Sequence, residues 1–292
     1  MRIENEYIKL NVTTCGGSMT SIFDKKRNEE LLYQKNPDSW QGQDVVIFPF
    51  IARLKDGYYT HNKKRYDFKN HGLIRYMIGE DVSNDENKIT ISFTSDNETL
   101  KRFPFQFELL VIYELEDNKI KISYDILNKS EEELPFEVGA HPAFKLPGTK
   151  TEKEFDISGN YLKFNQETQL HLMELDDTAS FVQGEIDFFE TDRIDLNKKL
   201  FNDINTIILK SKDFDNSISL FKKDGSKLTV RSNEAAFFAL WSDKTWGDYV
   251  CIEPWTGVPD YENPVREISK KPFIQKIKKG EHYVFTYEII ID

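Results

Sequence analysis

The sequence predicts an all-β protein, a large sandwich of many antiparallel strands. Three observations support this prediction. Apolar and polar residues alternate with a period of two along most of the chain, which is the spacing of half-buried strands. β-branched and aromatic residues fill these segments, and Gly, Asn and Asp separate them, as in strands that reverse direction. No segment has a helical period of comparable clarity, so the fold class is all-β.

Turn residues mark where the expected strands reverse. A Gly-Gly pair at 16–17 separates the first two strands, because glycine adopts the positive φ of a tight hairpin. A Glu-Asp-Asn turn at 116–118 and a Lys-Lys-Asp-Gly-Ser turn at 222–226 separate two later pairs. The expected strands are residues 8–12, 19–23, 88–94, 109–115, 119–127, 217–221, 227–231 and 283–291.

The chain shows no internal boundary. No Gly/Ser-rich or Pro-rich linker and no repeat divides it, and we expect one domain over residues 1–292, a monomer or a homodimer. With 39% apolar residues, including 22 Phe and 13 Tyr, it can bury a large aromatic core. The polar stretch 149–199 is expected to form long loops and edge strands. Short helical turns are expected at 37–43 and 263–269.

Charge and composition exclude several classes of protein. The formal net charge is −11 and no basic stripe is present, so nucleic acid is not an expected partner. The longest apolar run, 45–52, is far shorter than the roughly 20 residues of a membrane span, and no secretory signal follows the N-terminus. We expect a cytoplasmic protein in which Cys15 and Cys251 are reduced thiols. The sequence has no nucleotide-binding or metal-binding spacing, so no cofactor and no metal are expected.

Two polar residues stand immediately before prolines, which hold them extended at strand ends. His141 shares a strand face with Glu137 and Gly139, and the opposite face is apolar. Glu253 is flanked by apolar residues, so its carboxylate should find a partner or have a raised pKa, which makes it a candidate general base. A hydrogen-bonded structural histidine and a buried glutamate paired with an arginine are the alternatives.

Other residues could contact a ligand. Arg53 follows the apolar run 45–52, and its guanidinium needs an acceptor, either a structural carboxylate or ligand hydroxyls. The tryptophans suit either the core or the apolar face of a sugar ring. They are Trp40, Trp241, Trp246 and Trp255. We expect three histidines on the surface: His61, His171 and His282.

Four segments occur in the order of a known family. They are Phe-Pro-Phe-Ile-Ala-Arg-Leu at 48–54, Asn-His-Gly at 70–72, Gly-Ala-His-Pro-Ala-Phe at 139–144 and Cys-Ile-Glu-Pro-Trp-Thr-Gly-Val-Pro-Asp at 251–260. Together they resemble the aldose 1-epimerase (galactose mutarotase-like) family and, within it, the LacX-like branch. The resemblance implies a β-supersandwich with a concave sugar-binding cleft. It also implies interconversion of the α and β anomers of a free hexose, without cofactor or metal.

The resemblance carries roles to individual residues. Glu253 matches the general base that takes the C1 hydroxyl proton, and His141 matches the general acid that protonates the ring oxygen. His71 matches a second active-site histidine, Arg53 an arginine that holds sugar hydroxyls, and we expect Trp241 in the same cleft. For these roles His141 should have a pKa near or above about 6.5 and Glu253 should stay ionised, each favoured by attraction to the other.

One position departs from the family pattern. The family places an aspartate before a short β run, where this chain has Asn205, with Asp203 two residues earlier on the same face of an expected extended segment. This departure leaves open a non-catalytic sugar-binding or sensory protein. A hexose-phosphate mutarotase, with Lys145 or Arg75 binding the phosphate, is also open, because the wider family that the chain resembles includes such members. Glycoside cleavage fits least, because it generally needs two carboxylates.

Overall fold

Alternating burial builds the sheets of the structure, a computed structural model that describes residues 1–292. Strand β10 (Phe107–Glu116) buries every second side chain, and β11 (Lys119–Asn128) does so over most of its length. The two strands pair antiparallel through the turn predicted at 116–118, with Glu116 opposite Lys119. β25 (His282–Ile291) continues the sheet beside β11. Their inward faces are apolar, and the all-β prediction is confirmed.

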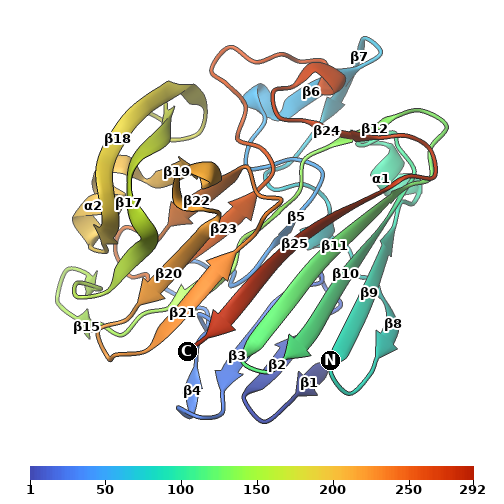
Figure 1. Cartoon of the computed structure of the whole chain (residues 1–292). Coiled ribbons are helices and arrows are strands. Elements are labelled where there is room, and N and C mark those ends of the chain that lie inside the picture. Colours follow the sequence, from blue (N-terminus) through green and yellow to red (C-terminus); the bar gives the residue numbers. More distant parts are fainter.

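The largest sheet has 15 strands, and most of its path runs β5-β13-β23-β22-β19-β17-β20-β21-β25-β11-β10-β9-β8 (Figure 1). β14 pairs with β23, and β18 pairs with β17. The other strands of this sheet are β5 (Val46–Ile47), β8 (Glu80–Asn84), β9 (Lys88–Thr94), β13 (Gly139–Ala140), β14 (Ala143–Lys145), β17 (Tyr161–Leu175), β18 (Val182–Asp195), β19 (Thr206–Lys210), β20 (Ser217–Phe221), β21 (Lys227–Arg231), β22 (Phe237–Trp241) and β23 (Tyr249–Trp255).

A four-stranded sheet packs near the β8–β11 end of the large sheet (Figure 1). The Tyr113 hydroxyl on β10 donates to the Gly17 carbonyl between β2 and β3, which joins the two layers. One cluster of 63 buried residues fills the space between the layers and beyond. The four strands are β1 (Arg2–Glu4), β2 (Ile8–Val12), β3 (Met19–Asp24) and β4 (Glu29–Glu30).

The remaining elements are short. Three two-stranded sheets are formed by β6 (Tyr58–His61) with β7 (Lys64–Asp67), β12 (Leu134–Phe136) with β24 (Gln275–Ile277), and β15 (Thr149–Lys150) with β16 (Phe155–Asp156). The α-helices are α1 (Asn97–Leu100) and α2 (Lys198–Ile204), and the 3₁₀ turns are η1 (Lys55–Gly57), η2 (Ile74–Tyr76), η3 (Ser211–Phe214) and η4 (Ile268–Lys270). No helix is long and apolar enough to cross a membrane.

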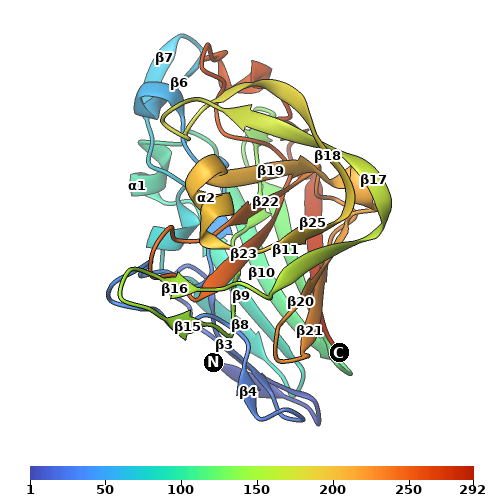
Figure 2. The same cartoon turned by 90° about the vertical axis from the view of Figure 1, so that its left-hand side faces the viewer.

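The polar stretch 149–199 differs from its prediction. Instead of long loops it contains the longest strands, β17 and β18, of 15 and 14 residues. They form a hairpin that curves away from the rest of the sheet, and Figure 2 views the molecule from this side. β18 is an edge strand, as expected. Both faces of this hairpin are partly exposed, so the alternation of apolar and polar residues that marks a half-buried strand is weak there.

The helical predictions were partly wrong. Residues 37–43 form turns without a helix, and only the end of 263–269 enters η4. Helix α2 was missed, although the Asn197 side chain accepts from the Leu200 amide at 2.9 Å, which is an ordinary helix N-cap. Asp203 therefore lies in a helix and not in an extended segment.

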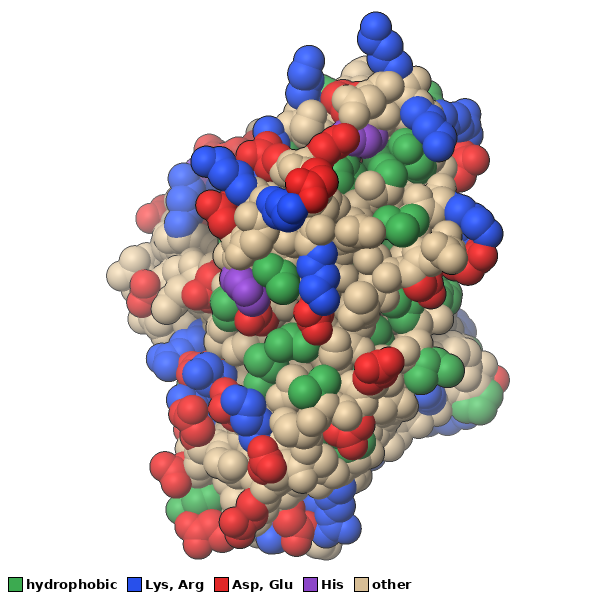
Figure 3. Space-filling view, turned by 90° about the vertical axis from the view of Figure 1, so that its right-hand side faces the viewer, with side chains coloured by type: hydrophobic (Ala, Val, Ile, Leu, Met, Phe, Trp, Pro, Cys, Tyr) green, Lys and Arg blue, Asp and Glu red, His purple; other side chains and the backbone are tan.

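The outer face of the β8–β11 and β25 region carries charges of both signs. Acidic and basic side chains are interspersed over the view in Figure 3. Several form cross-strand pairs, such as Lys119 with Glu288 at 3.0 Å and Lys88 with Glu114 at 3.1 Å. Opposite charges on neighbouring strands support the register of the sheet modestly, because exposed pairs contribute little to stability.

Candidate active site

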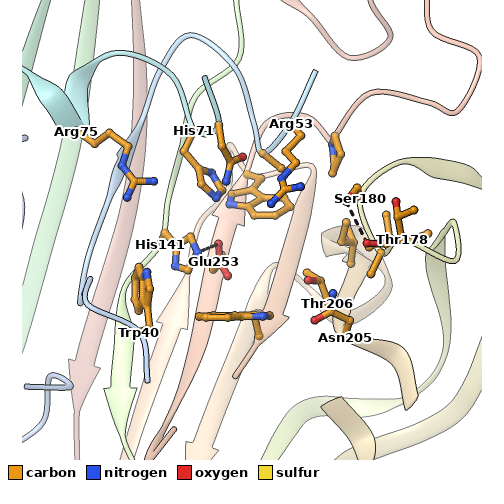
Figure 4. A pocket seen from close by; sticks show the side chains of 18 residues that line it. Trp40, Arg53, His71, Arg75, His141, Thr178, Ser180, Asn205, Thr206 and Glu253 are labelled. Carbon is orange, nitrogen blue, oxygen red and sulfur yellow. Dashed lines mark hydrogen bonds and ion pairs between the residues drawn. The ribbon is translucent and has the colours of Figure 1, made fainter. Parts of the chain in front are cut away.

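A cavity of about 360 Å³ lies where the β19, β22 and β23 strands meet several loops (Figure 4). Six of the seven site residues expected from the sequence line it. They are His141, Glu253, Arg53, His71, Asn205 and Trp241. Asp203 does not line it: its carboxylate is exposed on α2 and pairs with Lys199. Glu253 supplies the only carboxylate in the lining.

Strand pairing brings His141 to Glu253. Gly139 of β13 is opposite Trp255 of β23, and Ala143 of β14 is opposite Cys251, so the residue midway, His141, falls beside Glu253. His141 Nε2 lies 3.3 Å from Glu253 Oε2, with the side chains 9% and 1% exposed. The two residues are 112 positions apart in the chain, and only the sheet register makes them neighbours.

Aromatic rings hold the His141 imidazole in place. Its centroid lies 4.8 Å from the Trp40 ring, 5.2 Å from the His71 ring and 5.9 Å from the Trp241 ring. Three rings packed around an imidazole restrict its rotation, so its nitrogens point in a defined direction. Trp40 and Trp241 also present ring surface to the cavity, in the way that amphipathic aromatics present a face to a polar ligand.

The protonation state differs from the expectation. Burial raises the pKa of the Glu253 carboxyl well above its usual range and lowers the pKa of His141 to about 3. Burial, together with His141 and the nearby Arg75 and Arg53, also holds the pKa of His71 well below its usual range. The predicted imidazolium–carboxylate pair is therefore wrong, because desolvation outweighs mutual attraction. Burial therefore favours the uncharged form of the pair, a neutral His141 imidazole beside a protonated Glu253 carboxyl.

Several lining residues have backbones that L-amino acids seldom adopt. Ala52, His71, Ala179 and Asn205 all have φ between +46° and +66°. Such conformations cost about 1–2 kcal/mol per residue, and they persist where the surrounding structure imposes them. Their occurrence around one cavity agrees with its being a candidate functional site.

Gly72 explains why two of the sequence motifs lie together. It has φ of +83°, and a Cβ at this position would stand 1.9 Å from the Phe48 carbonyl oxygen. Glycine alone permits this approach. The segment that carries His71 therefore packs directly against the segment that carries Arg53, and both side chains reach the cavity.

Many polar groups at the cavity lack partners within the protein. The buried atoms without a hydrogen bond are Asn70 Oδ1, His71 Nδ1, His141 Nδ1, Glu253 Oε2 and Trp255 Nε1. An unpaired buried polar group costs about 1–3 kcal/mol, so this concentration fits a site built for a polar ligand. The Arg53 and Arg75 guanidinium groups lie on either side of His71, with no hydrogen bond or ion pair to the other lining residues (Figure 4).

A buried ion pair supports the cleft from behind. Glu137, between β12 and β13, accepts from the Ile51 amide at 3.0 Å and from the Lys271 ammonium. Lys271 also donates to the Val258 carbonyl at 2.8 Å. This network ties the segment before Arg53 to the segment after Glu253, so it fixes the distance between two walls of the cavity.

Some lining residues were not expected from the sequence. Thr178 and Ser180 come from the loop between β17 and β18, and Thr206 begins β19. The Asp176 side chain closes that loop by accepting from the Ser180 amide at 2.9 Å, so a turn could have been predicted there, but not its position over the cleft. Lys145, one of the two candidates for phosphate binding, is exposed on β14 and does not line the cavity, whereas Arg75 does.

This fold and this site define a class of protein. A large antiparallel β-sandwich carries a polar cleft with a buried His–Glu pair and aromatic walls, an arrangement suited to acid/base chemistry on a small polyhydroxylated molecule. The family model described as aldose 1-epimerase matches residues 1–287. The chain belongs to the aldose 1-epimerase family.

Relatives and solved structures agree with this membership. The plasmid and chromosomal LacX proteins of Lactococcus lactis subsp. lactis are each 28% identical, over 100% of this chain and 99% of the relative. A galactose mutarotase related enzyme from Lactobacillus acidophilus superposes with a TM-score of 0.92 at 29% identity, over 100% of this chain and 97% of that one. A galactose mutarotase-like protein from Lactobacillus casei ATCC 334 has a TM-score of 0.92 at 21% identity, over 100% and 99% of the two chains. The expected galactose mutarotase-like fold and the LacX-like relationship are confirmed.

Proposed function

We propose that this protein is an aldose 1-epimerase that interconverts the α and β anomers of a free hexose. The observation that carries the proposal is the 3.3 Å approach of His141 Nε2 to Glu253 Oε2 inside a polar cavity of about 360 Å³. This volume falls within the range of about 300–1,000 Å³ for small-molecule sites. Mutarotation needs one acid and one base, and this pair shares the single proton that such a cycle requires.

The reaction divides between the two residues. The Glu253 carboxylate takes the proton from the C1 hydroxyl, the O–H electrons form the C1 carbonyl, and the bond from C1 to the ring oxygen breaks. The His141 imidazolium gives its proton to the ring oxygen. Rotation about the C1–C2 bond presents the other face of the carbonyl, and the reverse transfers close the ring. Each positioned proton transfer is worth about 10²- to 10⁴-fold in rate.

The resting protonation state fits this cycle. Ring opening leaves a protonated Glu253 and a neutral His141, which is the form that burial favours. Before the ring of a bound sugar can open, the carboxyl proton has to move from Glu253 to His141. The distance between Glu253 Oε2 and His141 Nε2 is 3.3 Å. Sugar hydroxyls replace part of the solvation that both charged forms lack, so ligand entry favours the shift.

The other lining residues hold the sugar. Arg53, His71 and Asn205 offer hydrogen-bond donors and acceptors to hydroxyl groups, and Trp241 offers an apolar face to the ring. These contacts position C1 against the His–Glu pair. Positioning is part of the rate enhancement, because it replaces a chance encounter with a fixed one.

Polarimetry on freshly dissolved α-glucose and α-galactose tests the proposal. We expect the wild-type protein to accelerate mutarotation over buffer, and Glu253→Gln and His141→Ala to lose at least about 100-fold of that acceleration. His282→Asn is the matched control, because His282 is an exposed histidine bound to Asp125. Equal acceleration by Glu253→Gln contradicts the mechanism. Saturable sugar binding by calorimetry without any acceleration would indicate the non-catalytic sugar-binding function instead.

A hexose-phosphate mutarotase is the second candidate, favoured by the unpaired Arg53 and Arg75. Guanidinium groups bind phosphate bidentately, and two of them in one cleft exceed what a neutral sugar needs. Comparison of glucose with glucose 6-phosphate across a salt titration separates the two functions. Arg75→Met should raise the KM for the phosphate ester at least 10-fold and leave that for glucose nearly unchanged. Arg65→Met, an exposed arginine already paired with Asp67, is the control. Tighter, salt-insensitive binding of glucose excludes this candidate.

A further inference from the structure

We propose that His141, Cys251 and Glu253 form a binding site for a borderline-soft divalent metal ion such as Zn²⁺, and that metal bound there inhibits the protein reversibly. An imidazole nitrogen, a thiol sulfur and a carboxylate oxygen lie within 4.8 Å of one another. All three residues are buried, at 7%, 0% and 1% exposure. The inhibition rests on the proposed mutarotase function, whereas metal binding does not.

The sheet assembles these donors on one face. Cys251 and Glu253 are two residues apart on β23, so their side chains point to the same side. Ala143 is opposite Cys251, and His141, two positions before Ala143, lies beside Glu253. The site cannot be recognised from the sequence alone. Two of its residues form a Cys-x-Glu motif, and the third, the histidine, is more than 100 positions away.

The distances suit a tetrahedral ion. With Zn–N and Zn–O bonds of about 2.0–2.2 Å, two ligand atoms of a tetrahedron stand about 3.3–3.5 Å apart. His141 Nε2 and Glu253 Oε2 are 3.3 Å apart, and Glu253 Oε2 has no hydrogen-bond partner in the protein. A Zn–S bond of about 2.3 Å places the sulfur about 3.5 Å from the other two ligand atoms, so closing the present spread of up to 4.8 Å requires a shift of at most about 1.3 Å.

The chemistry of the donors selects the metal. Binding displaces the thiol proton and the carboxyl proton to solvent, and a dication with one thiolate and one carboxylate is neutral overall. A mixed N, S and O set favours Zn²⁺ over Mg²⁺ and Ca²⁺, which prefer oxygen ligands.

The position of the site explains the expected inhibition. The metal would occupy the same nitrogen and oxygen that move protons in the proposed reaction, and its open fourth position would face the sugar cavity. The cationic Arg53 and Arg75 line the same cavity and oppose a bound cation. This repulsion suits a reversible inhibitor that chelators remove.

Cobalt spectroscopy on a single-thiol protein tests metal binding directly. The chain has two cysteines, so Cys15→Ala leaves Cys251 as the only thiol. We expect Co²⁺ to bind Cys15→Ala at one ion per chain, with a near-ultraviolet thiolate charge-transfer band and intense visible bands of tetrahedral Co²⁺. Zn²⁺ should abolish both bands by displacement. Co²⁺ binding without a thiolate band, or no binding, overturns the proposed site even if Cys251 variants do not fold.

Inhibition is measured with a matched pair of variants. Zn²⁺ should inhibit the wild-type protein and Cys15→Ala equally, and a chelator should restore the rate. Cys251→Ala, compared with its own uninhibited rate, should need at least 10-fold more Zn²⁺ for half inhibition. Undiminished inhibition of Cys251→Ala contradicts the proposal. Cobalt bands from Cys251 in a protein without mutarotase activity would uphold the metal site and reject the proposed function, so the two failures are distinguishable.

Discussion

Lys271 and Glu137 form an ion pair behind the cleft in which the two side chains are only 5% and 0% exposed. The pair also binds the Ile51 amide and the Val258 carbonyl, and Asp260 Oδ1 lies 3.9 Å from the same ammonium. Each of these groups belongs to a segment that ends at a cavity wall. The pair thus acts on the site through backbone position, without touching the cavity.

Removing one partner should destabilise the fold strongly. Lys271→Met leaves the Glu137 carboxylate buried without its counterion, and loss of one member of such a pair typically costs about 3–5 kcal/mol. The free energy of unfolding in urea measures this loss. Lys279→Met is the control, because Lys279 pairs with Glu131 on the surface and its loss should cost less than about 1 kcal/mol. Equal effects of the two substitutions would contradict the prediction.

Asp44 should make the stability of the protein depend on pH. Burial raises the pKa of Asp44 to about 7 from an ordinary 3.8, although one carboxylate oxygen accepts from the Met19 amide at 2.8 Å. The folded state therefore binds a proton more tightly than the unfolded state. This contribution is fully present below about pH 4 and is lost as the pH rises through about 7, a change of up to about 4 kcal/mol.

Asp44→Asn isolates this effect. The amide cannot ionise, so the difference in unfolding free energy between variant and wild type should shift in favour of the variant between pH 4 and 7. Urea unfolding at several pH values measures the difference, and other titrating groups cancel because both proteins contain them. Parallel curves for the two proteins would show that Asp44 does not titrate in this range.

Asn205 should matter for affinity more than for folding. It has φ of +66° at the end of α2, and its side chain lines the cavity. Asn205→Gly removes the amide but accepts the backbone conformation, so stability should be unchanged or higher while the KM for the sugar rises roughly 10-fold. Asn205→Asp keeps an acceptor and should stay near the wild-type KM. An unchanged KM for Asn205→Gly would remove Asn205 from the binding site.

Gly72→Ala should disrupt the cleft through a steric clash. Its Cβ would meet the Phe48 carbonyl, which is backbone and cannot rotate away. Gly280→Ala is the matched control, because Gly280 has φ of +76° but open space around its Cα. The control should lose about 1–2 kcal/mol from backbone strain alone. Gly72→Ala should lose clearly more stability and also lose sugar affinity, since His71 moves with it. Equal losses would contradict the clash.

The sequence predicted most strands correctly but not the curved hairpin. Strands such as β10 and β11 bury one face, so a local alternation identifies them. β17 and β18 are partly exposed on both faces and lack that signal. Helix α2 has only 7 residues, too few to show a clear helical period of apolar residues. Only its N-cap, Asn197, could have indicated it.

Six of the seven site residues predicted from the sequence line the cavity, but the charge states of His141 and Glu253 were not predicted. Motifs identified His141, Glu253, His71 and Arg53, because the proline and glycine neighbours that shape these segments are local features of the chain. The pKa of His141 was predicted wrongly, since it depends on how completely Trp40, Trp241 and His71 exclude water from the ring.

The sequence alone predicted the fold class, the family and six of the 18 residues that line the cavity, because strand alternation, turn chemistry and short motifs act over a few positions. The tertiary structure decided which of these side chains meet. Only the register of β13, β14 and β23 brings His141 to Glu253 and adds Cys251 to them. Only burial inside the assembled sandwich decides whether His141 or Glu253 carries the proton. Desolvation is a property of the packed interior and not of any local segment.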